Sequence, residues 1–405
     1  MSTVLAETAP GPGTGGLLPF AQATLLYLPT TFVLPQVGLI LFLALSLFYF
    51  NSDFDRRDWL FLVFLIFIAA NSTLGIALGQ ANFEGLLGSN GIIGSVTLLA
   101  VYFSSRTLDN RVWYIFLGFI LLETATVFLQ LSLSVRYFFD AQAIEVPSWT
   151  TAGAYQIEKA QVLYRIRPFG LSIGSSPVAL KMITGLTLAT ILPMARYKRA
   201  ILIGILMIGL FVTFKRACLF GAFGYAGLMF LYDIHRNGWC RRHTVSALLT
   251  IFLGYQFLSN FLFQFFRGLD LSLFEAIELL DFGKESGRGF IWEQNFQFIL
   301  DNLLLGNYSS RYVFEGLPSH NSFIALVSMH GLIGSVLFAG FILRRLAEWP
   351  ARFFCLSPLL LTSVFHEGVF WYASAQDVLL FYVLTSFRGP LFQSNEPDGS
   401  APANR

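Results

Sequence analysis

Charged side chains are scarce in this chain of 405 residues: 12% are Asp, Glu, Lys or Arg, while 55% are apolar. Soluble domains carry about 25% charged residues, and half of that cannot cover a water-exposed surface of this size. The formal net charge of +2 offers no basic field for nucleic acid. The composition therefore excludes a cytosolic globular enzyme, a nucleic-acid-binding protein and a disordered protein, and it favours a polytopic membrane protein.

Cysteine is also rare, and Cys218, Cys240 and Cys355 lie far apart. An odd, scattered set argues against a disulfide framework and against a thiolate metal site. No Lys or Arg precedes Arg56, so we expect no secretory signal peptide. The sequence has no HExxH motif, no clustered His and carboxylate residues on the predicted outer loops, and no Walker or Rossmann glycine pattern. We therefore expect neither a metal ion nor a nucleotide cofactor.

Apolar runs of spanning length predict an all-α protein with about 11–12 transmembrane helices. We expect a flexible N-terminus over 1–16, one transmembrane domain over 17–392 and a disordered tail over 393–405. The predicted spans cover 31–50, 59–78, 91–103, 112–134, 178–194, 200–214, 217–232, 244–262, 321–343, 353–366 and 371–387, with a shorter span or re-entrant piece at 17–30.

Lys and Arg residues gather in alternate short loops, which the positive-inside tendency assigns to the cytoplasm together with the C-terminus. Two sizeable loops, 135–177 and 263–319, then lie on the outer face. Helical spacing predicts short helices at 271–281 and 288–304 within the second loop. Carriers usually keep their connections short and work at the midplane. Two large outer loops therefore point to chemistry at the outer face.

His320 is the strongest catalytic candidate, because it lies where the second outer loop enters the span 321–343. Ser319 or Asn321 can cap that helix. The positive end of the helix dipole disfavours an imidazolium and keeps the ring neutral, as a general base requires. The alternative is a structural histidine bonded to a loop carbonyl.

Several cations lie at predicted outer ends of spans. Lys215 and Arg216 join two spans on the face where basic residues are disfavoured, and the planar fork of Arg suits phosphate. Arg167 precedes the span 178–194, and Lys181 lies one turn inside it. These residues suit an anionic headgroup, although snorkelling to lipid phosphates is the alternative.

Other polar groups fall within the predicted spans. Glu123 and Asp377 are functional candidates, because intramembrane ionisable groups are costly, or else internal pairs that hold helices together. His330 is expected to be a buried, hydrogen-bonded packing residue.

A series of short motifs runs through the second half of the chain: Arg288, Trp292, Leu304-Leu305-Gly306, His320-Asn321 and Gly331-Leu332-Ile333-Gly334. This series resembles the O-antigen ligase and polymerase superfamily. Lys215-Arg216-Ala217 and Arg167-Pro168-Phe169-Gly170 resemble two further elements of that family. Two positions depart from its pattern: Lys215 replaces a common Ser, and Asn307-Tyr308 replaces a common Gly-x-Gly.

The resemblance covers roughly residues 165–340. It implies a metal-independent, inverting membrane glycosyltransferase with a GT-C-like fold, located in the bacterial cytoplasmic (inner) membrane with its active site facing the periplasm. Its donor is a glycan on undecaprenyl diphosphate. Within this resemblance His320 is the base, and Arg288 and Arg216 stabilise the leaving diphosphate. The implied substrate-binding residues are Arg167, Lys215, Asn321, Trp292 and Lys181.

Two acceptors remain open. A polymerase extends a lipid-linked repeat unit into O-antigen or exopolysaccharide, whereas a ligase transfers the glycan to lipid A–core; a third branch of the family glycosylates proteins. We favour a polymerase, because two outer loops suit two lipid-linked substrates. Family analogy adds a flippase and a chain-length regulator as partners. From another class, a lipid-linked sugar transporter would suit Glu123, Asp377 and Lys181 inside spans.

Overall fold

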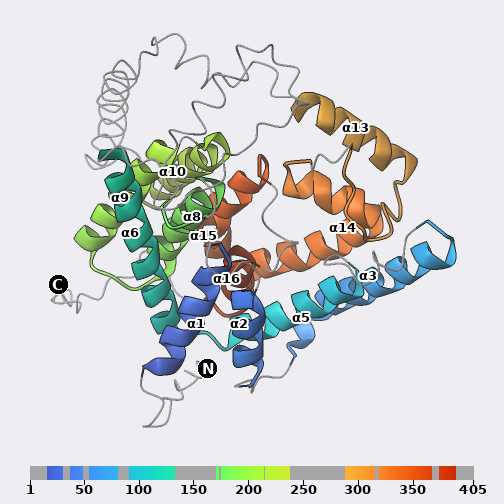
Figure 1. Cartoon of the computed structure of the whole chain (residues 1–405), viewed down its shortest axis with the longest axis horizontal. Coiled ribbons are helices and arrows are strands. Elements are labelled where there is room, and N and C mark those ends of the chain that lie inside the picture. The colour runs from blue at the N-terminus through green and yellow to red at the C-terminus, as the bar shows by residue number, and fades with distance from the viewer. Residues whose placement is uncertain are drawn as a thin grey trace, which may run out of the picture.

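The computed structural model describes residues 16–30, 37–48, 54–80, 91–132, 170–172, 175–213, 215–237, 288–314, 319–366 and 374–388. These residues form helices and contain no β-strand (Figure 1). The helices are α1 (Leu17–Tyr27), η1 (Leu28–Thr30), α2 (Val37–Phe48), η2 (Arg56–Asp58), α3 (Trp59–Ala77), α5 (Ile92–Arg106), α6 (Asn110–Ser132), α8 (Ser175–Ile191), α9 (Arg196–Thr213), α10 (Arg216–Asn237), α13 (Arg288–Asp301), α14 (Ser322–Glu348), α15 (Ala351–Ser363) and α16 (Ala375–Thr385).

Among the described residues, three helical stretches are long and apolar enough to cross a membrane: Arg56–Ala77, Asn110–Gln130 and Ser322–Glu348. Shorter apolar helices accompany them, among them α1, which forms where a short twelfth segment was expected. The all-helical prediction is confirmed for the described residues. The predicted span 244–262, the predicted helix 271–281 and the two terminal segments lie outside the described residues.

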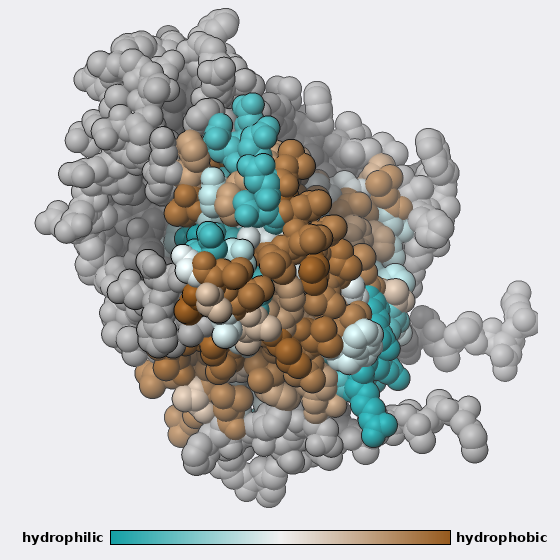
Figure 2. All heavy atoms as spheres, turned by 90° about the vertical axis from the view of Figure 1, so that its right-hand side faces the viewer, coloured by the Kyte–Doolittle hydropathy of each residue, from teal (hydrophilic) through white to brown (hydrophobic). Residues whose placement is uncertain are grey.

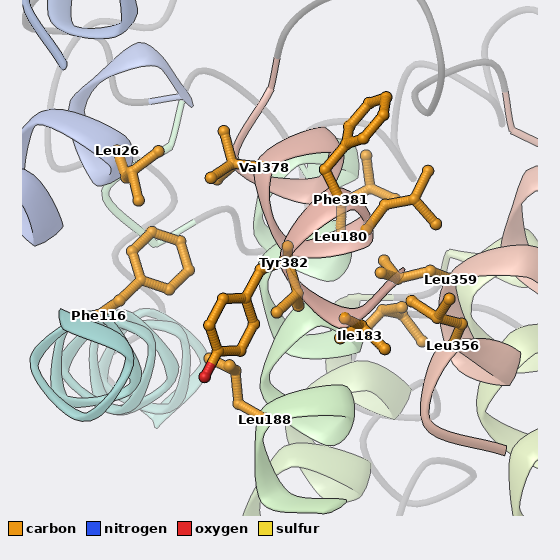
Figure 3. Close-up of a cluster of buried hydrophobic side chains, with 14 of the residues drawn as sticks. Leu26, Phe116, Leu180, Ile183, Leu188, Leu356, Leu359, Val378, Phe381 and Tyr382 are labelled. Carbon is orange, nitrogen blue, oxygen red and sulfur yellow. The ribbon is translucent and has the colours of Figure 1, made fainter. Parts of the chain in front are cut away.

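The core forms around α16, whose residues are all buried. A helix that is apolar on every side must be enclosed by others. Figure 3 shows how α16 contributes Val378, Phe381 and Tyr382 to a cluster with side chains of α1, α6, α8 and α15. Asp377, which the sequence places inside the predicted span 371–387, lies in the first turn of α16. There it forms a capping box with Ser374, so its carboxylate serves to start the helix.

The predicted continuous span 321–343 is corrected by a break inside α14. Gly331 has φ 61° and ψ −169°, outside the helical region, and Figure 1 shows α14 as two segments joined at a sharp bend. The hydropathy pattern could not reveal this, because the apolar run continues through the bend. The segment after Gly331 has 17 residues and a rise of about 26 Å, which is near the lower limit for crossing a membrane.

An ionic cluster forms around the buried side chains of Arg345 and Asp58. Arg345, near the end of α14, donates from Nε to Asp58 over 2.5 Å, from one terminal nitrogen to Asp55 over 2.8 Å and from the other to Glu348 over 2.9 Å. Tyr102 of α5 donates to the second oxygen of Asp58. This cluster, the Arg345 cluster, ties α3, α5 and α14 together at the end opposite to His320.

The face that carries α3, α13 and α14 is largely apolar (Figure 2). Hydrophobic side chains cover its centre, and hydrophilic ones gather toward its margins. Helices α3 and α14 have exposed large apolar side chains, including Ile66, Leu74, Val336 and Leu343. A soluble protein rarely exposes so much continuous apolar surface, so this face is suited to contact lipid.

Candidate functional site

Residues 319–321, directly before α14, form a hydrogen-bonded turn that we call the His320 corner. The Asn321 side chain caps the helix by accepting hydrogen bonds from the backbone N–H groups of Phe323, over 2.9 Å, and Ile324, over 3.1 Å. The Ser319 hydroxyl donates to the carbonyl of Asn321 over 2.9 Å and accepts from its N–H over 3.3 Å. Both side chains are buried. The prediction that Ser319 or Asn321 caps the helix is confirmed for Asn321.

His320 lies between these two residues with a left-handed backbone, at φ 53°. A residue with a side chain adopts this region rarely, and holding it there costs on the order of 1–3 kcal/mol. The bonds of Ser319 and Asn321 impose the conformation, while His320 itself remains only half-buried. Such strain persists where the surrounding structure fixes it, and it is common at functional sites.

Helix α13 is fastened to this corner through Trp292. The indole N–H donates to the carbonyl of Ser319 over 2.7 Å, and the indole stacks on Phe365 with ring centroids 6.0 Å apart. Arg288 is the first residue of α13 and lies one turn before Trp292, on the same face. The side chain of Arg288 is outside the described part of the chain.

Helix α10 also contacts Phe365. The ring of Phe220 packs edge-on against the ring of Phe365, with centroids 4.8 Å apart. Arg216 begins α10 one turn before Phe220, on the same face. The Ser322 hydroxyl donates to the carbonyl of His366 over 3.0 Å, which adds α14. The first turns of α10, α13 and α14 therefore converge on residues 365–366, although the side chain of Arg216 is not among those described.

The convergence of these three helix N-termini favours the binding of an anion. The N-terminal end of a helix carries partial positive charge, which attracts anions, although at α14 the N–H groups of Phe323 and Ile324 are already bonded to Asn321. None of these three first turns contains Asp or Glu. Lys215 is half-buried directly before α10, and the predicted short connection between α9 and α10 is confirmed.

The loop that follows α13 fills the bend in α14. The N–H groups of Asn307 and Ser309 donate to the carbonyls of Ser328 and Met329, each over 2.8 Å. In return, Leu332 N–H donates to the carbonyl of Leu303 over 2.8 Å. The loop thus satisfies backbone groups that the break would leave unpaired in an apolar surrounding.

Two glycines allow the loop after α13 to approach the bend of α14 this closely. A Cβ on Gly306 would meet the backbone nitrogen of Gly331 at 2.5 Å, and a Cβ on Gly331 would meet that of Gly306 at 2.6 Å. Both have left-handed φ angles, of 60° and 61°. The Leu-Leu-Gly and Gly-Leu-Ile-Gly motifs, which the sequence places 25 positions apart at their glycines, therefore meet in space.

A buried polar cluster supports the same loop. The Ser309 hydroxyl lies 3.0 Å from Nδ1 of His330 and accepts from the Asn71 amide over 3.1 Å. The same amide also donates to the carbonyl of Leu305 over 2.9 Å. His330 is fully buried, so the prediction of a packing role is confirmed. The roles of Asn71 and Ser309 are not predicted by any motif in the sequence, where the only signal for Asn71 is an amide inside an apolar run.

Two further residues were predicted to contact the substrate, Lys181 and Arg167. Lys181 is buried in α8, and its ammonium forms a 2.6 Å ion pair with Glu123 of α6. Of the two readings for Glu123, this contact favours an internal pair. Arg167 lies outside the described residues. Among the described residues, no group of three or more His, Cys, Asp and Glu side chains could hold a metal ion.

No protein-family model matches the chain, and no curated protein matches its sequence.

Proposed function

We propose that the chain is a polytopic membrane glycosyltransferase with a GT-C-like fold that polymerises oligosaccharide repeat units carried on undecaprenyl diphosphate. Its site faces the periplasm, and its basic loops, with the Arg345 cluster, face the cytoplasm. The observation that carries the proposal is the convergence of the first turns of α10, α13 and α14 beside the strained His320. The apolar helices support the membrane location.

The reaction joins an acceptor sugar hydroxyl to the anomeric carbon of the donor. The hydroxyl oxygen attacks that carbon, the bond to the diphosphate oxygen breaks, and the configuration inverts. His320 accepts the hydroxyl proton as the new bond forms. The leaving diphosphate keeps the electron pair of the broken bond and carries its negative charge.

Arg216, Arg288 and Lys215 stabilise the leaving diphosphate. Guanidinium groups bind phosphate oxygens through paired, charge-assisted hydrogen bonds, and these strengthen as charge develops. Each arginine begins a helix whose dipole adds to its charge. Trp292 and Asn321 position His320. Trp292 bonds to Ser319, the residue before His320, and Asn321, the residue after it, bonds to Ser319 and caps α14. Arg167 contributes a further diphosphate contact, and no metal ion is required.

The proposal is tested by glycan transfer with purified protein in detergent and chelator. A lipid-diphosphate-linked repeat unit is supplied alone, and the products are separated by length. A ladder of longer lipid-linked glycans supports the polymerase. Transfer only after lipid A–core is added identifies a ligase with the same site. Absence of transfer to either acceptor contradicts the proposal and favours a transporter.

A further inference from the structure

Helix α13, which packs beside α14 (Figure 1), presents three different faces. Each face is a set of side chains with helical spacing: Ile291, Asn295 and Ile299 are buried, Glu293, Gln297 and Asp301 are polar and accessible to water, and Phe296 and Leu300 are apolar and exposed. Glu293, Gln297 and Asp301 are called the polar face below. The side chain of Leu300 is 66% exposed and that of Phe296 is 52% exposed. An exposed apolar face beside a polar one is typical of a helix at a boundary between water and an apolar phase.

The apolar face continues beyond α13 onto the bend of α14. Leu303 and Leu304, in the turn that follows α13, are also exposed, and with Phe296 and Leu300 they form what we call the apolar stripe. The carbonyls of Leu303 and Leu304 accept hydrogen bonds from the N–H groups of two exposed residues of α14, over 2.8 and 3.3 Å: Leu332 and Ile333. Because α14 is long and apolar enough to cross a membrane, the stripe adjoins the exposed apolar surface of a candidate span.

The depth of this junction follows from α3, which belongs to another candidate span. The Asn71 amide of α3 donates to the carbonyl of Leu305, in the turn after α13, over 2.9 Å. Asn71 lies six residues before Ala77, where α3 ends away from the Arg345 cluster, and this is about 9 Å at a rise of 1.5 Å per residue. An interfacial helix buries its apolar face about 5–10 Å into the boundary between headgroups and acyl chains. The turn after α13 therefore lies at the depth that such a helix reaches.

Neither water nor the membrane interior suits both exposed faces of α13. In water the four large side chains of the apolar stripe would stay hydrated, which is unfavourable for apolar surface. Deep in the hydrocarbon, the carboxylates of Glu293 and Asp301 would lose their water, which is costly for charged groups. Only the interface gives each face the surrounding that it prefers. Since α13 has no Lys or Arg after Arg288, its binding to lipid depends on the apolar stripe and not on attraction to anionic headgroups.

We propose that α13 is an interfacial helix whose apolar stripe contacts the acyl chains of the bilayer, at the end of the bundle that carries His320, while its polar face contacts water. Trp292 bonds α13 to Ser319, so this contact holds the His320 corner at the level of the lipid headgroups. The inference goes beyond the proposed function and does not depend on the reaction that the site performs.

The test locates spin labels on the purified full chain in phosphatidylcholine nanodiscs by electron paramagnetic resonance. Leu300→Cys places a label on the apolar stripe, and Gln297→Cys is the matched control on the polar face of the same helix. Both are made with Cys240→Ala, whereas Cys218 and Cys355 are kept because they are buried and out of reach of the label. Oxygen, which concentrates among acyl chains, and a water-soluble nickel chelate are the two relaxing agents.

We expect the Leu300→Cys label to be reached by oxygen and shielded from the chelate, at a depth of about 5–10 Å below the headgroups. The Gln297→Cys label should be reached by the chelate. Equal access of the chelate to both labels would overturn the proposal, because the stripe would then face water. Shielding of the Leu300→Cys label from both agents would also overturn it, since protein and not lipid would cover the stripe. If Leu300→Cys does not fold, Phe296→Cys decides the outcome by the same criteria.

Discussion

Phe365 is the residue on which the site depends most, although no motif includes it. Its ring lies against Trp292 of α13 and Phe220 of α10. Each of these aromatic residues follows, by one turn, an arginine that begins its helix. Trp292 also bonds to Ser319, the residue before His320. The aromatic contacts thus set the relative positions of the helices that begin at Arg216 and Arg288 and of the residue proposed as the base, His320.

Trp292→Phe tests the bond between α13 and the His320 corner. Phenylalanine keeps an aromatic ring against Phe365 but cannot donate to the Ser319 carbonyl. We expect the turnover number for glycan transfer to fall about tenfold, and the stability to fall by about 1 kcal/mol. The control is Phe296→Leu, an exposed position on the same helix. Equal behaviour of the two variants would mean that the indole N–H does not position His320.

For single residues, the sequence predicts the roles of those that belong to local patterns. Asn321 could be predicted as a helix cap, and Trp292 belongs to the same local motif as Arg288. Partners that are distant in the sequence could not be predicted. Lys181 reads as a cation at a membrane entry, and only the fold brings it to Glu123, 58 residues away. Phe365 gave no signal, because an aromatic residue at a span end is ordinary.

The bend of α14 is the feature that matters most at the scale of elements. The sequence predicts the helix and both glycine motifs, but hydropathy alone makes 321–343 a straight span. The break depends on the loop of residues 302–311, whose backbone replaces the missing helical hydrogen bonds. Such an exchange cannot be predicted from a pattern within one segment. It fixes the loop after α13 to the segment of α14 that begins beside His320.

Gly331→Ala tests this exchange. The added Cβ would be strained by φ 61° and would collide with the carbonyl of Leu304 and the backbone of Gly306. We expect a loss of about 3 kcal/mol or more, measured as a lower apparent melting temperature in detergent, with loss of glycan transfer.

Gly340→Ala is the matched control on the same helix, since its Cβ would only touch Leu60 at 3.4 Å. Because alanine favours a helix over glycine, this variant should be as stable as the unsubstituted chain or more so. A stable and active Gly331→Ala protein would show that the loop does not depend on the glycine bend.

Across the whole molecule, polar anchors hold the helical bundle at two ends. The His320 corner is at one end of α14 and the Arg345 cluster at the other. Burial raises the pKa of Asp55 in that cluster, but hydrogen bonds from Arg345 and from the Arg57 N–H outweigh it, so that the net shift is downward. Asp55 therefore stays ionised at neutral pH, and its contribution to stability is lost only as the pH falls through its lowered pKa.

Arg345→Met tests the cluster. It leaves the fully buried Asp58 without its cation, and breaking a buried pair in this way costs on the order of 3–5 kcal/mol. The apparent melting temperature should fall sharply. Arg344→Met, at an exposed neighbouring position, should change it little. Similar melting temperatures for the two variants would show that the cluster does not hold α3 and α14 together.

The overall architecture was the easiest property to predict, because apolar length and scarce charge leave few alternatives to a helical membrane protein. Positions within the bundle were not predictable in the same way. The enclosure of α16 and the meeting of α10, α13 and α14 depend on contacts between segments far apart in the sequence.

The central claim is that His320 removes the proton of the acceptor hydroxyl. The most direct measurement is the single-turnover rate of glycan transfer by His320→Ala at saturating lipid-linked substrate, beside its affinity for undecaprenyl diphosphate. Loss of a general base predicts a rate lower by about 10²–10⁴-fold, with an affinity within about twofold of the unsubstituted chain. Transfer by His320→Ala at a rate close to that of the unsubstituted chain would contradict the account.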